Sequence, residues 1–331
     1  MFVCTNSIRL PRLKGLSVLL WFSLVLGVTP LWSKPIPIGF YELRPYNDTV
    51  EKLSKAAAWS RPDIAGVAIR VYWNAIQSHS ESEYDWSYID QVAALAKQSG
   101  KQFSINITGG LNAPSWVYAI GSDGAGSHKF TISGSGISGA MPAPWDSNFQ
   151  RRWFTFLATL ANRYDALPNL SYVIVTGQGS GGQATLCRSQ ADNAELAADG
   201  GLNAWVNAFV SITGLYIKAF NQTPLIVNIG NPVFPRGLGG FKTANDLCVS
   251  TYGVRYGIKN NGLSPSLPVS GWQATEIKAL SGNHPVGFQM LSPAGNANDL
   301  VQSIEIGKEI GAELFEVYPT DLALVSNFSS L

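Results

Sequence analysis

Carboxylate and amide side chains that follow short apolar runs are the residues of this sequence best placed to do chemistry. Residues 172–180 read YVIVTGQGS, a run that ends at the amide of Gln178, and Gln289 stands at the end of a similar run. Glu42 and Glu316 end two others. Two carboxylates held close together separate their pKa values and divide acid and base roles, whereas an amide offers hydrogen bonds but no acidic proton. The carboxylates therefore predict catalysis, and the amides predict ligand binding.

The elements that must position these residues alternate regularly along the chain. Eight β-rich runs lie at residues 36–42, 64–73, 101–108, 170–177, 224–230, 254–259, 284–290 and 313–318. Helix-like segments separate them, at residues 48–59, 86–99, 147–164, 201–220, 241–252, 272–281 and 296–309. Alternating strands and helices indicate parallel pairing. Eight such units predict an α/β fold of the (β/α)8 TIM barrel type, with an open doubly wound sheet as the competing arrangement.

The carboxyl ends of the strands of a parallel barrel meet at one mouth, where catalytic residues belong. The predicted mouth collects Glu42, Arg70, Tyr72, Trp73, Asn106, Gln178, Asn228, Lys259, Asn260, Gln289, Glu316 and Tyr318. Amides pair with hydroxyl groups in both directions, and Trp73, Trp116 and Trp145 could stack on a sugar ring. The lining therefore favours a neutral carbohydrate as ligand, with core packing as the alternative role of each tryptophan.

A long connection rich in Gly and Ser spans residues 109–146. Connections of this length are usually lids or binding loops, and in a barrel this one follows the third strand on the catalytic face. We therefore expect this segment to be a lid, with a flexible insertion as the alternative.

Two stretches resemble clan A glycoside hydrolases, in particular the family-42 β-galactosidase type. They are IRVYWNAIQSHSESEYDWSYIDQVAALAKQSGKQFSINITGGLNAPSWVY (69–118) and PWDSNFQRRWFTFLATLANRY (144–164). The resemblance implies a retaining mechanism, with an acid/base carboxylate at the end of strand 4 and a nucleophile at the end of strand 7. Those places hold Gln178 and Gln289, and neither Asp nor Glu occurs between Asp165 and Cys187 or between Glu276 and Asp299.

Two hypotheses follow from the missing carboxylates. In the first, the chain is a glycoside hydrolase with a relocated set: Glu316 first, then Glu42 on the neighbouring strand, with Asp146 as a third candidate. Ion pairs with Lys259, Arg44 or Arg70, and helix capping by Asp146, are the structural alternatives. In the second, the barrel has lost catalysis and keeps a carbohydrate groove.

The proposed binding residues are common to both hypotheses. They are Arg70, Trp73, Asn106, Trp116, Trp145, Gln178, Asn260, Gln289 and Tyr318. Arg70 would orient the ligand or belong to an internal ion pair. Neither a metal site nor a cofactor is expected, because the three histidines are scattered and no metal-type cysteine spacing occurs.

The amino terminus reads as a secretory signal peptide over residues 1–33, followed by one barrel domain over residues 34–331. We predict a secreted or periplasmic protein, with membrane anchoring by residues 16–28 as the alternative. Removing residues 1–33 takes three of 23 basic residues and none of 22 acidic ones, which leaves 20 against 22. This balance makes nucleic acid an unexpected partner. Export would permit a disulfide between Cys187 and Cys248, but the spacing does not decide it.

Overall fold

The computed structural model describes residues 34–46, 48–120, 125–134, 136–235 and 239–331, all within one compact unit, Trp32–Leu331. The predicted signal peptide, residues 1–33, and the alternative anchor, residues 16–28, lie outside the described residues. Within the described ranges, no helix combines the length and apolarity needed to cross a bilayer. The domain boundary at residue 34 therefore stays a prediction.

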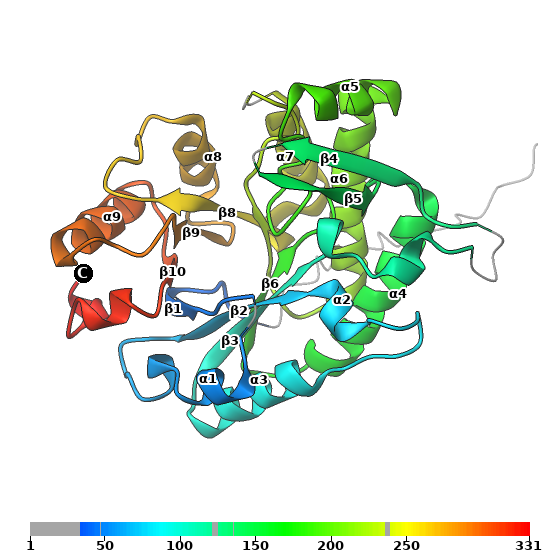
Figure 1. The fold of residues 1–331 in the computed structure, drawn as a ribbon. Coiled ribbons are helices and arrows are strands. Elements are labelled where there is room, and N and C mark those ends of the chain that lie inside the picture. Colours follow the sequence, from blue (N-terminus) through cyan, green and yellow to red (C-terminus); the bar gives the residue numbers. More distant parts are fainter. Residues whose placement is uncertain (1–33, 47, 121–124, 135, 236–238) are drawn as a thin grey trace, which may run out of the picture. The chain divides into compact units, whose positions relative to one another are not determined.

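Eight parallel strands close into a barrel (Figure 1). They are β1 (Gly39–Leu43), β2 (Gly66–Tyr72), β3 (Gln102–Thr108), β6 (Leu170–Val175), β7 (Leu225–Asn228), β8 (Tyr256–Leu263), β9 (Val286–Met290) and β10 (Leu314–Val317). Neighbours follow chain order, and β1 pairs with β10 to close the ring. The predicted (β/α)8 TIM barrel and all eight of its strands are confirmed.

Helices connect successive strands around this barrel. The α-helices are α1 (Val50–Ser54), α2 (Trp73–Ile76), α3 (Ser87–Gln98), α4 (Ser147–Tyr164), α5 (Gln190–Ala198), α6 (Gly201–Ala219), α7 (Gly239–Tyr252), α8 (Trp272–Leu280) and α9 (Ala297–Glu309). Six short 3-10 helices complete the described part: η1 (Ala57–Trp59), η2 (Gly110–Asn112), η3 (Ser115–Tyr118), η4 (Gly253–Arg255), η5 (Asp321–Ala323) and η6 (Phe328–Ser330). The sequence did not predict α2 and α5, which lie in the connections after β2 and β6.

Helix α4 illustrates how the outer layer is held. Phe149, Trp153, Phe156 and Leu160 recur at three- and four-residue spacing and are all buried. This spacing gives one apolar stripe along the helix, and the stripe belongs to the large core that joins the helices to the outer face of the strands.

Alternation along the strands separates that outer core from the barrel interior. The interior carries a small apolar cluster: Tyr41, Leu43, Ala68, Tyr172, Ile174, Ile226 and Leu314. Toward the carboxyl ends of the strands the inward positions become polar, as at Asn106, Lys259 and Glu316. The interior is thus apolar in one part and polar toward the mouth.

The connection over residues 109–146 contains an antiparallel hairpin, which the sequence did not predict. Its strands are β4 (Lys129–Gly134) and β5 (Ile137–Pro142), and β4 lies beside α5 (Figure 1). Phe130 and Ile132 are fully buried, and the backbone N–H of Ser133 donates to Asp192 Oδ1 of α5 at 2.8 Å. These contacts tie the hairpin to the barrel.

Close strand packing makes Gly66 a sensitive position. A Cβ added there would lie 1.9 Å from the carbonyl oxygen of Gln102. We predict that Gly66→Ala lowers the free energy of unfolding by about 1–3 kcal/mol, because overpacking forces the backbone to shift. Denaturant unfolding measures the change. The matched control is Gly181→Ala, where the new Cβ meets no atom within 4 Å; equal losses in the two variants would contradict the prediction.

Candidate functional site

A cavity of about 470 Å³ opens at the mouth of the barrel. Its walls come from the ends of β2, β3, β8 and β9, from β5, and from the loops after β1, β3 and β6. The lining residues are Tyr46, Arg70, Tyr72, Asn106, Thr108, Leu111, Asn112, Ile137, Ser180, Gly182, Gln183, Arg188, Asn261 and Gln289. Among these described residues there is no Asp or Glu. The cavity therefore offers hydrogen bonds and positive charge, without a carboxylate.

Two polar atoms of this lining have no hydrogen-bond partner. Asn106 Oδ1 and Thr108 Oγ1 are unpaired, although their residues are only 6% and 2% exposed. Both lie on β3 and line the cavity. Because buried polar groups are almost always hydrogen-bonded in native proteins, these atoms indicate a partner that enters the cavity, either a ligand or water.

Arg70 lies toward the end of β2, next to Asn106 in the register of β2 and β3, and two contacts fix its side chain. Its Nε donates to the carbonyl oxygen of Arg44 at 2.8 Å, and its guanidinium lies 4.6 Å from the ring centroid of Tyr46. Tyr46 in turn stacks on Tyr72, with centroids 4.9 Å apart and planes 7° from parallel. Two roles were expected for Arg70, either orienting a ligand or forming an internal ion pair. Arg70 forms no ion pair with any described residue.

Glu316 lies inside the barrel and is bound to other protein groups. Its Oε2 accepts a hydrogen bond from Lys259 Nζ, and its Oε1 accepts one from Tyr172 Oη at 2.8 Å. The two side chains of the ion pair are 1% and 3% exposed. Burial lowers the pKa of Lys259 from its ordinary value, and the Glu316 charge opposes this shift. Burial raises the pKa of Tyr172 well above its ordinary value, and the Glu316 charge adds to the shift.

Glu42 lies on the other side of the barrel wall from Glu316. In the register of β1 and β10, Tyr41 is opposite Glu316 and Glu42 is opposite Val317. Opposed residues share a face of a sheet, so Glu316 faces inward with Tyr41 and Glu42 faces outward with Val317. The expected Glu42–Glu316 pair is therefore not formed.

The Glu42 carboxylate belongs to a buried hydrogen-bonded network on the outer side of the barrel wall. Glu42 Oε1 accepts from Arg44 Nη1, and its Oε2 accepts from the backbone N–H of Ala58 at 2.9 Å. Arg44 also donates to Asp48 at 2.7 Å, and Asp48 accepts from Tyr88 Oη at 3.0 Å. The alternative weighed for Glu42, an ion pair with Arg44, is what the structure contains.

Asp146 caps helix α4. Its Oδ1 accepts a hydrogen bond from the backbone N–H of Phe149 at 2.7 Å, and its backbone is extended, as at an N-cap. It does not line the mouth cavity. The structural alternative for this carboxylate, helix capping, is therefore present.

The two glutamines at the ends of strands 4 and 7 differ in their surroundings. Gln178 is fully buried, and neither the oxygen nor the nitrogen of its side-chain amide has a partner. Its main-chain carbonyl oxygen accepts a hydrogen bond from Trp205 Nε1 at 2.8 Å. Gln289 is 7% exposed and lines the mouth cavity. The amide that could meet a ligand is therefore Gln289, while Gln178, in the loop after β6, is enclosed and does not line the cavity.

The three tryptophans expected as sugar platforms do not line the mouth. Trp73 is fully buried among other aromatic rings, 4.7 Å from Trp153 between centroids. Trp116 contacts Trp73 edge to face, and Trp145 contacts Phe130 in the same way. Core packing, the alternative role considered for each, is what the structure shows.

Asn260 and Tyr318 were expected to bind the ligand, but neither lines the cavity. Asn260 Oδ1 accepts from the backbone N–H of Gly262, and a register irregularity between Asn260 and Leu263 turns Asn261 into the cavity instead. Tyr318 is half-buried against the interior cluster and does not line the cavity. Of the proposed binding residues, the structure therefore brings Arg70, Asn106 and Gln289 together.

Several lining residues were not singled out as binding residues by the sequence. Tyr72, Thr108 and Asn261 follow Arg70, Asn106 and Lys259 at a spacing of two, which is the signal for a shared strand face. The others come from loops: Tyr46, Asn112, Ser180, Gln183 and Arg188. No periodicity marks loop residues, so only their position after a strand could have indicated them.

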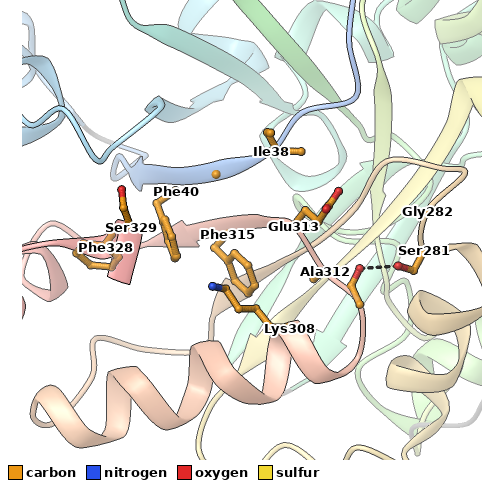
Figure 2. A pocket seen from close by; sticks show the side chains of 12 residues that line it. Ile38, Phe40, Ser281, Gly282, Lys308, Ala312, Glu313, Phe315, Phe328 and Ser329 are labelled. Carbon is orange, nitrogen blue, oxygen red and sulfur yellow. Dashed lines mark hydrogen bonds between the residues drawn. The ribbon is translucent and has the colours of Figure 1, made fainter. Parts of the chain in front are cut away.

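A second cavity, of about 560 Å³, lies at the amino-terminal ends of β1 and β10, beside α9 (Figure 2). Its walls include Phe40, Phe315 and Phe328, with Lys308 and Glu313 as its charged residues. It contains none of the predicted site residues. Because functional sites of these barrels lie at the carboxyl ends of the strands, the mouth cavity is the stronger candidate.

Cys187 and Cys248 are both buried and free, so the permitted disulfide is absent. Burial raises the pKa of each thiol to about 12. Neither cysteine therefore supplies a thiolate nucleophile near neutral pH.

Comparison with known proteins supports the fold. The catalytic domain of a β-amylase from Paenibacillus polymyxa superposes with a TM-score of 0.59, over 87% of this chain and 94% of that domain, at 13% sequence identity. At this identity the likeness shows the barrel fold and nothing finer. No family model matches the sequence, and no curated protein does.

The buried ion pair yields a test of what Glu316 does. In Glu316→Gln, burial still lowers the pKa of Lys259 and the opposing charge is gone. The unfolded chain then binds a proton on Lys259 as the pH falls through the ordinary pKa of 10.5, whereas the folded chain binds it only at lower pH. Stability of the variant should therefore fall as pH decreases from about 10 toward neutrality, by up to about 1.4 kcal/mol per pH unit.

Urea unfolding at several pH values measures this slope. The control is Lys259→Met combined with Glu316→Gln, which removes both charges and should lose the added pH dependence. A single variant that is as stable as the wild type at every pH would show that the pair does not stabilise the barrel.

Proposed function

We propose that this chain binds a saccharide in the mouth of the barrel without hydrolysing it. The observation that carries the proposal is the composition of the cavity wall: unpaired, buried hydrogen-bonding atoms at Asn106 and Thr108, and no carboxylate among the described lining residues. A sugar hydroxyl can donate a hydrogen bond to Asn106 Oδ1, and it can donate to or accept from the hydroxyl of Thr108. The likeness to a glycoside hydrolase catalytic domain makes a sugar the ligand class to test first.

The lack of hydrolysis follows from what glycosidic cleavage requires. Common mechanisms use two carboxyl groups about 5–10 Å apart on either side of the bond. Here Glu42 faces outward and is bound to Arg44, and Asp146 caps α4. Glu316 alone faces inward, and it is held by Lys259 and Tyr172. No described pair of carboxylates thus faces the cavity.

Hydrolysis with Glu316 as acid or base is the competing function. One observation favours it: Glu316 is on the inner face, opposite Gln289 in the register of β9 and β10, and Gln289 lines the cavity. A ligand that separated Lys259 from Glu316 would free the carboxylate for chemistry. This function requires turnover, which the binding function does not.

A panel of oligosaccharides tests the two functions together. We expect at least one sugar class to bind in calorimetry and to be recovered intact after long incubation with the protein. Release of new reducing ends, abolished in Glu316→Gln, would contradict the proposal and favour the hydrolase.

Blocking the mouth tests where the sugar binds. A Cβ at Gly182 would lie 2.7 Å from Tyr46 Oη and 3.3 Å from Asn106 Nδ2, inside the cavity wall. We predict that Gly182→Val weakens binding at least about tenfold, equivalent to about 1.4 kcal/mol. Gly181→Val is the matched control, because an added Cβ there meets no atom within 4 Å. Unchanged affinity in Gly182→Val would place the sugar elsewhere.

A further inference from the structure

The described lining of the mouth cavity is positively charged. Arg70 and Arg188 both line it, and the described lining residues include no Asp or Glu. The inward carboxylate of Glu316 is bound to Lys259, and Glu42 and Asp48 are bound to Arg44 outside the barrel wall. These three carboxylates are thus already paired with other cations.

The fixed side chain of Arg70 is suited to binding a ligand. Its Nε is used by the Arg44 carbonyl and its plane lies against Tyr46, which leaves its two terminal nitrogens without a hydrogen-bond partner among the described residues. A guanidinium fixed in this way presents a rigid fork that matches the oxygens of a carboxylate or sulfate. A partly buried cation without such a partner is costly, so the fork indicates an anion in the bound state.

Arg188 reaches the same cavity from the loop after β6. Its Nε donates to Ser180 Oγ at 3.0 Å, and its backbone N–H donates to Asp192 Oδ2 at 2.7 Å. Asp192 also completes the capping box of α5 with Ser189. The loop that carries Arg188 is therefore anchored on a helix end, and its cation is held at the cavity.

We propose that the ligand of the mouth is an anionic saccharide, whose carboxylate or sulfate group binds Arg70 with support from Arg188. Its hydroxyl groups would pair with Asn106 and Thr108, which are buried and unpaired beside the arginines. This inference rests on the proposed saccharide-binding function and names its substrate class. It replaces the neutral sugar expected from the sequence, because that expectation rested on the amides of the mouth and did not include Arg188.

Matched sugars test the inference on the intact protein. One pair is a uronic acid oligosaccharide and its carboxyl-reduced form, and the other is a sulfated oligosaccharide and its desulfated form. We expect one anionic member to bind about 10- to 100-fold more tightly than its neutral counterpart, as for a charge-assisted hydrogen-bond pair. The pair that shows the difference identifies the anion.

Variants assign the effect to the arginine. Arg70→Gln should remove most of the preference for the anionic member, measured as the ratio of the two affinities, whereas Arg70→Lys should keep part of it. Lys278→Gln, at an exposed position on α8, is the control for loss of one positive charge. Thermal unfolding of each variant confirms that it is folded.

Three results would overturn the inference. Equal binding of anionic and neutral members would refute the anion and leave saccharide binding intact. An anion preference that survives in Arg70→Gln and in the Arg70→Gln/Arg188→Gln double variant would place the anion away from this cavity. Absence of binding by all four sugars would count against the proposed function itself, and against the inference with it.

Discussion

The buried ion pair between Lys259 and Glu316 is the constraint on which the barrel interior depends. Both side chains are almost fully enclosed, and Tyr172 satisfies a second oxygen of the carboxylate. Removing one partner of such a pair leaves an uncompensated charge in a region of low dielectric, which is far more costly than the pair itself. The one inward carboxylate among the described barrel strands is thereby held by other protein groups, and the cavity near it is lined by amides, hydroxyls and arginines.

Charged side chains are also paired with one another on the outer side of the barrel wall. Arg44 binds Glu42 and Asp48, and its carbonyl oxygen fixes the side chain of Arg70. One buried network thus removes two carboxylates from chemistry and orients the cation that faces the cavity. Loops complete the wall through backbone contacts, as where the N–H of Leu111 donates to the carbonyl oxygen of Ser180. A Cβ at Gly110 would lie 2.5 Å from the carbonyl oxygen of Gly179, and its φ is +48°, so glycine is needed for this approach.

The fold was predictable from the sequence because long apolar runs alternate with amphipathic helices, and parallel pairing then limits the architecture. The site was predictable only in part. Arg70, Asn106 and Gln289 follow from the rule that strand ends meet at the mouth. Glu42 was misplaced because β1 is buried on both faces, so a period of two leaves no signal of which residue points inward. Asn260 was displaced by a local register irregularity, and Arg188 lies on a loop whose position depends on long-range contacts.

A crystal structure of the protein with a bound oligosaccharide would test the central claim most directly, because one map reports both the position and the integrity of the sugar. The account predicts an uncleaved sugar in the cavity that Arg70 and Asn106 line, with the Lys259–Glu316 pair still joined. A sugar bound elsewhere, or a cleaved product beside a Glu316 carboxylate that has left Lys259, would contradict it.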